Sequence, residues 1–322
     1  CSAVRAATSR RSVVVVARLW SPPSSSRPCR SGDGGPDPHT LPQGDASDLT
    51  LLRAAMDEFR RCWAGDAPSA KWKLERDASG VAGLHVVEDF LGPSEVEALR
   101  TVHGAHRAWT QYTYGTQGAR GELASVVQRI DFGPDDASKG LQPEGVVGGA
   151  PMWRLGEMRA EIVAAVGARL RHVFGAASLW AGTAPDTLQL TRMGVKQELA
   201  NHYDKRDKWK EGIASVAWSE LPCEEDLRGE PWVLNMELGT TKDRKVVTRT
   251  MPPGSAYVLM GTAQGITKFC ERRSVGHNRC NCCWTHGVQL AGSIARQSMT
   301  LRCLAESADM DETSDEEEGA AD

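Results

Sequence analysis

Apolar residues recur at two different spacings along the chain, and the change of spacing separates predicted helices from predicted strands. Spacings of three and four predict amphipathic helices over 52–63, 93–102 and 155–173. Short apolar runs between turn residues predict strands over 84–90, 187–193, 212–218, 231–238, 245–251, 255–260 and 296–304. The pattern predicts an α+β fold that is mainly β, with a double-stranded β-helix (jelly roll) core and helices packed on one face.

Composition divides the chain into three predicted parts. Residues 1–46 are rich in Ser, Pro, Gly and Arg, contain no acidic residue before Asp33, and are predicted to be disordered. Residues 47–304 carry the regular pattern and are predicted to form one domain. Residues 305–322 are predicted to be a disordered acidic tail, because residues 303–322 hold nine acidic groups and neither Lys nor Arg.

Charge and cysteine usage narrow the class of protein. The formal net charge is −4, but without the nine acidic groups of the tail the chain has 38 basic and 33 acidic groups, a mildly basic body compatible with a polyanionic partner. No run approaches the roughly 18 apolar residues of a membrane span, so we expect a soluble monomer without membrane contact. Nine unevenly spaced cysteines favour a reducing compartment, nuclear or cytoplasmic. The leader is also typical of a transit peptide, which leaves a chloroplast or mitochondrial location open.

The strongest candidate for chemistry is the short sequence Asn201-His202-Tyr203-Asp204. One residue separates His202 from Asp204, so at a strand end both side chains point the same way and can hold one metal ion. His286, in a strand-like run that begins at Trp284, offers a third ligand. Two His and one carboxylate suit non-haem Fe(II), because they cover one face of an octahedron and leave three positions for a bidentate co-substrate and O2.

Two arginines follow on the last predicted strand. Arg296 and Arg302 are six residues apart, so both project from the same strand face and can reach a dicarboxylate. His-x-Asp, a distant His-Gly-Val and Arg-x5-Arg, in this order, resemble the AlkB-type Fe(II)/2-oxoglutarate-dependent dioxygenases over roughly residues 84–304. The resemblance implies Fe(II) held by His202, Asp204 and His286, with 2-oxoglutarate and O2 as co-substrates. It also implies a forked contact from Arg296 to the distal carboxylate of 2-oxoglutarate, with Arg302 lining the same pocket.

The chain departs from the family pattern beside the co-substrate. Where the family has Asn-x-Tyr on the strand before the metal ligands, this chain has Thr191 and Met193. Thr191 keeps a hydroxyl but Met193 has no donor, and one lost hydrogen bond to a charged ligand costs about 1.5–3 kcal/mol. We therefore expect weakened 2-oxoglutarate binding, which Gln189 on the same strand face can offset.

Two segments are expected to contact substrate. Residues 112–132 are predicted to form a hairpin with a Gly-rich first half, which in the resembled family is a lid over a flipped nucleotide; an ordinary surface hairpin is the alternative. The stacking and polar groups of this hairpin are Tyr112, Tyr114, Gln128 and Arg129. The loop from Lys205 to Lys210 contains four cations and Trp209, which can hold phosphates and stack a base unless the loop is only a solvated surface.

One loop concentrates sulfur ligands, namely Cys270, His277, Cys280, Cys282 and Cys283. By residue type they fit a tetrahedral zinc (Zn) site, but their spacing fits poorly because Cys282 and Cys283 are adjacent. Oxidation-sensitive free thiols and an inert loop are the alternatives.

The activity that the resemblance implies is oxidative demethylation of alkylated DNA or RNA. In that reaction 2-oxoglutarate and O2 give succinate and carbon dioxide, and an N-methyl group is hydroxylated and leaves as formaldehyde. A dioxygenase of the same fold that acts on protein side chains is favoured if the hairpin and the basic loop do not face the metal. A non-catalytic binding module that uses the Cys-rich loop and the acidic tail is favoured if Thr191 and Met193 abolish co-substrate binding.

Overall fold

The computed structural model describes residues 46–63, 72–106, 110–114, 125–134, 152–175, 179–195, 197–222, 228–239, 244–267, 270, 280–290 and 294–305. All of them belong to one unit, residues 43–322. The predicted leader and the predicted acidic tail lie outside the described residues, apart from Ala46 and Ala305 at their borders.

The described helices are few, and the described strands belong to three sheets. The helices are α1 (Ala46–Trp63), α2 (Pro93–Gly104), α3 (Gly156–Phe174) and α4 (Gly261–Gln264), with 3-10 turns at Ala78–Gly80 and Leu179–Gly182. The nine strands of the large sheet are β1 (Lys73–Glu75), β2 (Leu84–Glu88), β3 (Thr110–Tyr114), β4 (Ser125–Gly133), β5 (Met152–Arg154), β6 (Thr187–Met193), β9 (Ile213–Ser219), β12 (Ser255–Leu259) and β15 (Arg296–Arg302). The four-stranded sheet contains β7 (Glu198–His202), β10 (Trp232–Leu238), β11 (Lys245–Met251) and β14 (Trp284–Leu290), and the pair β8 (Asp204–Lys205) and β13 (Gly265–Ile266) forms a third sheet.

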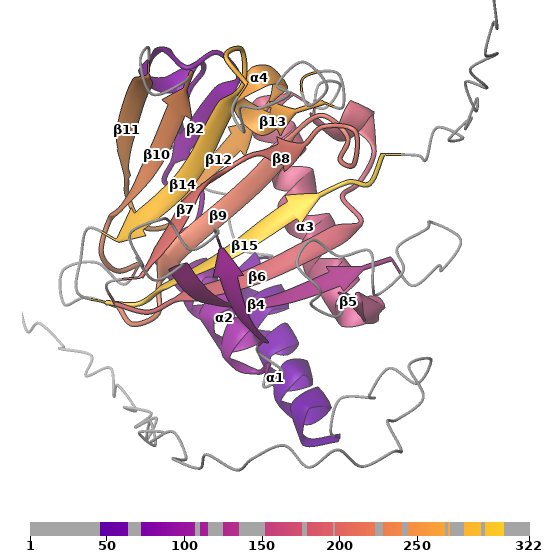
Figure 1. Cartoon of the computed structure of the whole chain (residues 1–322). Coiled ribbons are helices and arrows are strands. Elements are labelled where there is room, and N and C mark those ends of the chain that lie inside the picture. The colour runs from indigo at the N-terminus through magenta and orange to yellow at the C-terminus, as the bar shows by residue number, and fades with distance from the viewer. Residues whose placement is uncertain are drawn as a thin grey trace, which may run out of the picture. The chain divides into compact units, whose positions relative to one another are not determined.

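One face of the large sheet is apolar and packs against α1, α2 and α3 (Figure 1). Side chains alternate between the two faces of a strand, and the apolar residues on one face of β6, β9 and β15 enter this core, as Leu190, Val216 and Leu301 do. The predicted helix spacing supplies the other half of the core, for example Leu99 of α2 and Val166 of α3, both buried. This core holds the sheet rigid from behind.

The opposite face of the same sheet is polar, although it is buried. Gln189, Thr300, Ser215 and Tyr257 are register partners across β6, β15, β9 and β12, and all four are buried. The four-stranded sheet covers this face, where Trp232 packs with Tyr257 in a second buried cluster. Burying polar groups costs free energy unless they form hydrogen bonds. This row of polar side chains therefore indicates a binding site, because packing alone does not favour it.

The mainly β class with a few helices is confirmed, and the strands over 187–193 and 245–251 have the bounds that the pattern predicts. Other predicted strands begin or end one or two residues away. The short strands β1, β5, β7, β8 and β13 were not predicted, because they are too short or too polar to show apolar alternation. None of the described helices is both long enough and apolar enough to cross a membrane.

Candidate metal centre

Neighbouring strands bring the three predicted metal ligands together. β7 pairs antiparallel with β14, and His202 at the end of β7 is the register partner of His286. Asp204 opens β8, which pairs in parallel with β13 at Gly265. Gly265 has a φ of +145°, and a Cβ there would overlap the carbonyl oxygen of Asp204, so this close approach requires glycine.

The ligand atoms of these three residues all lie within 4.8 Å of one another. Nε2 of His286 lies 3.4 Å from Oδ2 of Asp204, and the two imidazole centroids are 4.4 Å apart. Nδ1 of His202 is 3.0 Å from the carbonyl oxygen of Ala200, a contact that fixes the ring and leaves Nε2 for a ligand. Metal bonds of about 2.1 Å that meet at right angles place donor atoms roughly 3.0 Å apart, so small side-chain movements suffice to bind one ion.

The protonation states also suit a metal. Burial, together with the nearby His202, lowers the pKa of His286 to about 3, so its imidazole is neutral at ordinary pH. Burial alone would raise the pKa of Asp204, but its basic neighbours, the charge of Arg302 foremost, outweigh burial and hold that pKa below its usual value. Oδ2 of Asp204 is buried and accepts no hydrogen bond from the described residues. A neutral imidazole and a free carboxylate oxygen are the forms that bind a divalent cation.

Arg302 lies beside the metal centre and orients its carboxylate. One guanidinium nitrogen is 3.7 Å from Oδ1 of Asp204, and another donates to Oε1 of Gln189 at 2.7 Å. Gln189 in turn donates to the hydroxyl of Thr191 at 3.1 Å. From the sequence, Gln189 and Thr191 were both expected to help bind the co-substrate. In this structure they form a hydrogen bond with each other, and Gln189 also forms one with Arg302.

Arg296 occupies the other end of the same strand face. Its side chain is 4% exposed, and its guanidinium lies 4.3 Å from the ring centroid of Trp232. It donates to Oγ of Ser298 at 3.2 Å and to the sulfur of Met193 at 3.6 Å, while its Nε has no hydrogen-bond partner in the described part of the chain. Among the described residues no carboxylate pairs with Arg296, and burial lowers its pKa to about 10. A buried cation of this kind calls for an anionic ligand.

Tyr257 lies between the two arginines and was not identified as a site residue from the sequence. Burial raises the pKa of its phenol, and the charges of Arg296, Asp204 and Arg302 all act on it, which places the ring near both Arg296 and the metal centre. The phenol also forms a hydrogen bond with Ser215. The alternation of β12 contained this signal, but only the strand order shows which face Tyr257 occupies.

Only two of the four predicted lid side chains, those of Gln128 and Arg129, belong to the described part of the structure. The side chains of Tyr112 and Tyr114 lie outside the described part of the structure. Gln128 and Arg129 are neighbours on β4 and therefore point to opposite faces of the sheet. Arg129 lies on the polar face and forms a forked ion pair with Asp131, at 2.6 and 2.7 Å. Gln128 lies on the other face.

The basic loop is also arranged differently from the expectation. Trp209 is buried with Ile213 and Leu304 and lies under the guanidinium of Arg302, 5.2 Å from ring centroid to Cζ, so its ring is not an open platform for a base. Lys205 is exposed. Burial, followed by the charges of Arg302 and Arg129, lowers the pKa of Lys208, which places this lysine at the rim of the metal centre.

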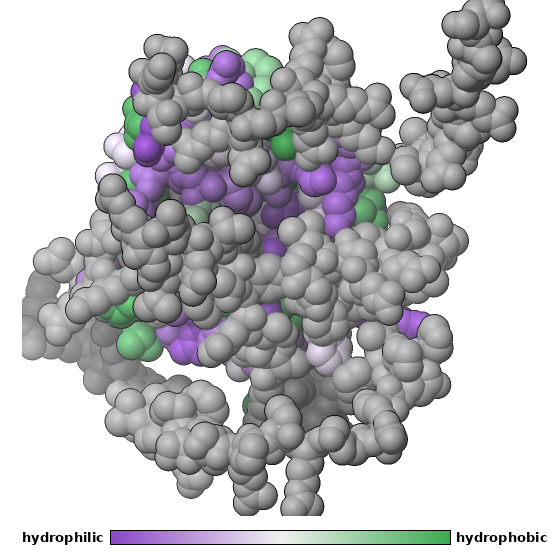
Figure 2. All heavy atoms as spheres, in the orientation of Figure 1, coloured by the Kyte–Doolittle hydropathy of each residue, from purple (hydrophilic) through white to green (hydrophobic). Residues whose placement is uncertain are grey.

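The surface around these strands is hydrophilic. Figure 2 shows hydrophilic residues predominating among the coloured atoms in the region where Figure 1 draws β7, β8 and β14. A polar rim of this kind is compatible with a charged substrate.

The predicted zinc ligands are partly brought together. Cys270, Cys280, Cys282 and Cys283 form one group, with sulfur atoms within 4.8 Å of one another. His277 lies outside the described residues.

Comparison with known proteins gives similarity in structure alone. No protein-family model matches the sequence, and no curated protein matches it. The structure is similar to that of OsALKBH1, with a TM-score of 0.40 and 13% identity, over 68% of this chain and 97% of that one. It is also similar to an oxidoreductase of the 2OG-Fe(II) oxygenase family from Burkholderia pseudomallei, with a TM-score of 0.39 and 13% identity, over 85% of this chain and 92% of that one.

Proposed function

We propose that this protein is an Fe(II)- and 2-oxoglutarate-dependent dioxygenase that removes N-alkyl groups from the bases of DNA or RNA. The observation that carries the proposal is that the His202–Asp204–His286 cluster, in which His286 is buried, accompanies a buried guanidinium, Arg296, for which the described residues offer no acidic partner. In this proposal the two facing sheets are the two halves of a double-stranded β-helix, and the catalytic domain spans residues 47–304.

In this proposal one group of residues binds the metal and another binds the co-substrate. His202, Asp204 and His286 would hold Fe(II), which supplies the activation of O2 when it is bound. Arg302 keeps the Asp204 carboxylate ionised and oriented from the side. Away from the metal ligands, Arg296 would donate two hydrogen bonds to the distal carboxylate of 2-oxoglutarate. This forked contact is the geometry that guanidinium groups favour.

Tyr257 and Met193 are the further residues that would line the co-substrate site. Tyr257 lies near both Arg296 and the metal centre, and its phenol can donate to the co-substrate while Ser215 supports it from behind. Met193, where the resembled family has Tyr, contacts Arg296 through its sulfur and supplies no donor. We therefore assign to Tyr257 the phenolic contact that Met193 lacks.

The substrate assignment depends on the cations at the rim. Lys205 and Lys208 can contact a phosphate backbone near the metal centre, which favours a nucleic acid. The burial of Trp209 favours the second candidate, a dioxygenase acting on protein side chains, because it removes one expected base-stacking ring.

The experiment that tests the proposal is 2-oxoglutarate turnover by the iron-loaded protein with different prime substrates. Succinate would be measured with methylated single strands, methylated duplexes and peptides, and formaldehyde release would report demethylation. We expect succinate and formaldehyde in equal amounts with a methylated nucleic acid. Turnover with peptides alone would support the second candidate, and His202→Ala protein with full turnover would overturn both.

A further inference from the structure

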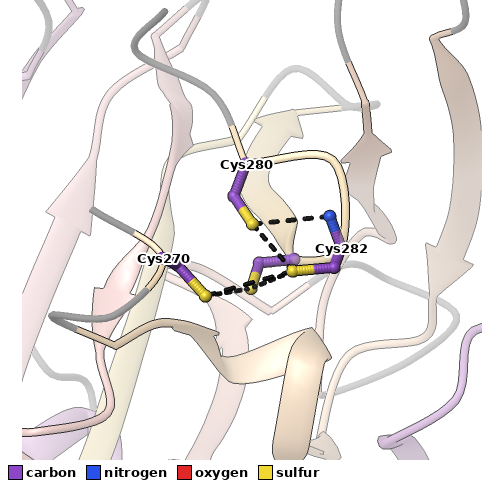
Figure 3. A group of neighbouring side chains, drawn as sticks. Cys270, Cys280 and Cys282 are labelled. Carbon is purple, nitrogen blue, oxygen red and sulfur yellow. Dashed lines mark hydrogen bonds between the residues drawn. The ribbon is translucent and has the colours of Figure 1, made fainter. Parts of the chain in front are cut away.

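Four cysteine sulfurs converge beside the metal centre, on the side of β14 where the strand begins (Figure 3). The sulfur of Cys270 is 4.0 Å from that of Cys282 and 3.7 Å from that of Cys283. The sulfurs of Cys282 and Cys283 are 3.7 Å apart, and those of Cys280 and Cys282 are 2.9 Å apart. None of the four forms a disulfide with a described residue.

These distances match a single tetrahedral ion. With Zn–S bonds of about 2.3 Å, the edges of a ZnS4 tetrahedron are roughly 3.8 Å long, close to three of the four distances. An iron–sulfur cluster places several iron atoms and sulfides between its cysteines and needs them further apart. Among single ions, four thiolates favour Zn²⁺ over harder cations such as Mg²⁺ or Ca²⁺.

Local structure explains how an irregular spacing can build this group. Residues 281–283 form a bend, so the neighbouring Cys282 and Cys283 can turn their sulfurs to one point, which an extended chain would not allow. The backbone N–H of Cys282 donates to the sulfur of Cys280 at 3.4 Å. Cys270 arrives from the other side, and the Thr267 hydroxyl accepts its backbone N–H at 3.4 Å. The sulfur positions are therefore set by separate segments that meet, as in a structural metal site.

The cysteine group is also connected, by one contact or along the chain, to the strands around the neighbouring metal centre. The hydroxyl of Tyr203, the residue between His202 and Asp204, accepts the backbone N–H of Cys280 at 3.0 Å. Cys283 lies three residues before His286 on the chain that becomes β14. Cys270 follows β13, the strand that pairs with β8 at Asp204.

We propose that Cys270, Cys280, Cys282 and Cys283 bind one structural Zn²⁺ ion, and that this ion braces the three segments that carry His202, Asp204 and His286. The first part stands on the sulfur geometry alone. The second part, the bracing of an iron site, rests on the proposed function.

The test of the first part uses the full chain, prepared anaerobically in reductant. Zinc content would be measured in the wild type, in Cys280→Ser and Cys283→Ser, in the control Cys62→Ser on α1, and in His202→Ala. We expect stoichiometric zinc in the wild type, Cys62→Ser and His202→Ala, and a loss of most zinc in the other two variants. Zinc-free wild type should bind Co²⁺ with the thiolate charge-transfer and intense d–d bands of a tetrahedral sulfur site.

Because this readout does not depend on oxidation of any substrate, it separates the zinc site from the dioxygenase proposal. Wild-type protein that takes up neither zinc nor cobalt, or a cobalt spectrum without thiolate bands, would overturn the site even if the Cys→Ser variants do not fold. A disulfide between Cys280 and Cys282 in the anaerobic protein, found by mass spectrometry, would also overturn it.

The bracing role has its own measurement. Tyr203→Phe keeps all four sulfurs but loses the hydroxyl that contacts Cys280, so we expect full zinc content together with at least severalfold weaker Mn²⁺ binding at the His-Asp-His centre. Unchanged Mn²⁺ affinity in both Tyr203→Phe and Cys280→Ser would refute the bracing and leave the zinc site standing.

Discussion

Because the guanidinium of Arg296 is buried, we predict that removing it leaves the protein as stable or more stable but weakens the binding of 2-oxoglutarate. Burial lowers its pKa from 12.5 to about 10, which corresponds to roughly 3 kcal/mol against the charged form at this position. The contact with the Trp232 ring returns about 0.5–2 kcal/mol, and among the described residues no carboxylate compensates the rest. In the ligand-free protein this charge therefore lowers the free energy of unfolding, and an anionic ligand would offset that cost.

Arg296→Met removes the charge but keeps an unbranched apolar side chain. We expect the free energy of unfolding of the ligand-free protein to stay the same or rise by about 1 kcal/mol, a gain of roughly 2–4 °C in Tm. A forked contact contains two charge-assisted hydrogen bonds, so 2-oxoglutarate binding should weaken by at least about 3 kcal/mol, or roughly 100-fold. Titration calorimetry with Mn²⁺ in place of iron would measure the affinity, and urea unfolding the stability.

A matched control is available in Arg169, another buried arginine of the same molecule. Its guanidinium forms a forked ion pair with Glu95, at 2.6 and 2.9 Å, on the apolar side of the large sheet. Arg169→Met leaves Glu95 buried without its partner, so we expect a loss of about 3–5 kcal/mol in stability and unchanged 2-oxoglutarate affinity. If Arg296→Met instead behaves as the control does, Arg296 is a structural residue and the co-substrate assignment fails.

Three further predictions follow from the site and its surroundings. His202→Ala, Asp204→Ala and His286→Ala should each abolish stoichiometric iron binding while circular dichroism stays unchanged, because three ligands leave no spare; full iron occupancy in two of them would place the site elsewhere. Lys208→Ala should weaken binding of single-stranded nucleic acid and reduce the slope of log K against log salt by about 0.7, whereas an unchanged slope would remove Lys208 from the interface. Burial, with the charge of His106 adding to it, lowers the pKa of His103 to about 3, so between pH 6.5 and 3 the unfolded chain binds a proton that the folded protein does not. Metal-free protein should thus lose stability as the pH falls through that window, by roughly 1.4 kcal/mol per pH unit for this histidine, and His103→Gln should show a correspondingly smaller loss in urea titrations at pH 7, 6 and 5.

Several features of the site could be predicted from the sequence, because their geometry is local. A separation of two residues places His202 and Asp204 on the same side, and a separation of six does the same for Arg296 and Arg302, whatever the rest of the chain does. Helix and strand periods likewise predicted the mainly β class and most strand positions, since alternation depends only on neighbours in sequence.

Tertiary structure decided which of these local patterns meet. Tyr257 lies near the metal centre only because β12 is two strands from β15 and Tyr257 is on the polar face of the large sheet. The strand order also decided that Arg129, and not its neighbour Gln128, lies on the polar face, and the packing of Ile213 and Leu304 buried Trp209. None of these outcomes is encoded in spacing, because each depends on a partner far away in sequence.

The cysteines show this division most clearly. Their spacing argued against a metal site, yet a bend at 281–283 and the separate arrival of Cys270 bring four sulfurs within 4.8 Å. Sequence alone determined which ligand types the loop contains. The tertiary structure decided that they converge, because a tetrahedral site requires positions in space and places no fixed demand on their order along the chain.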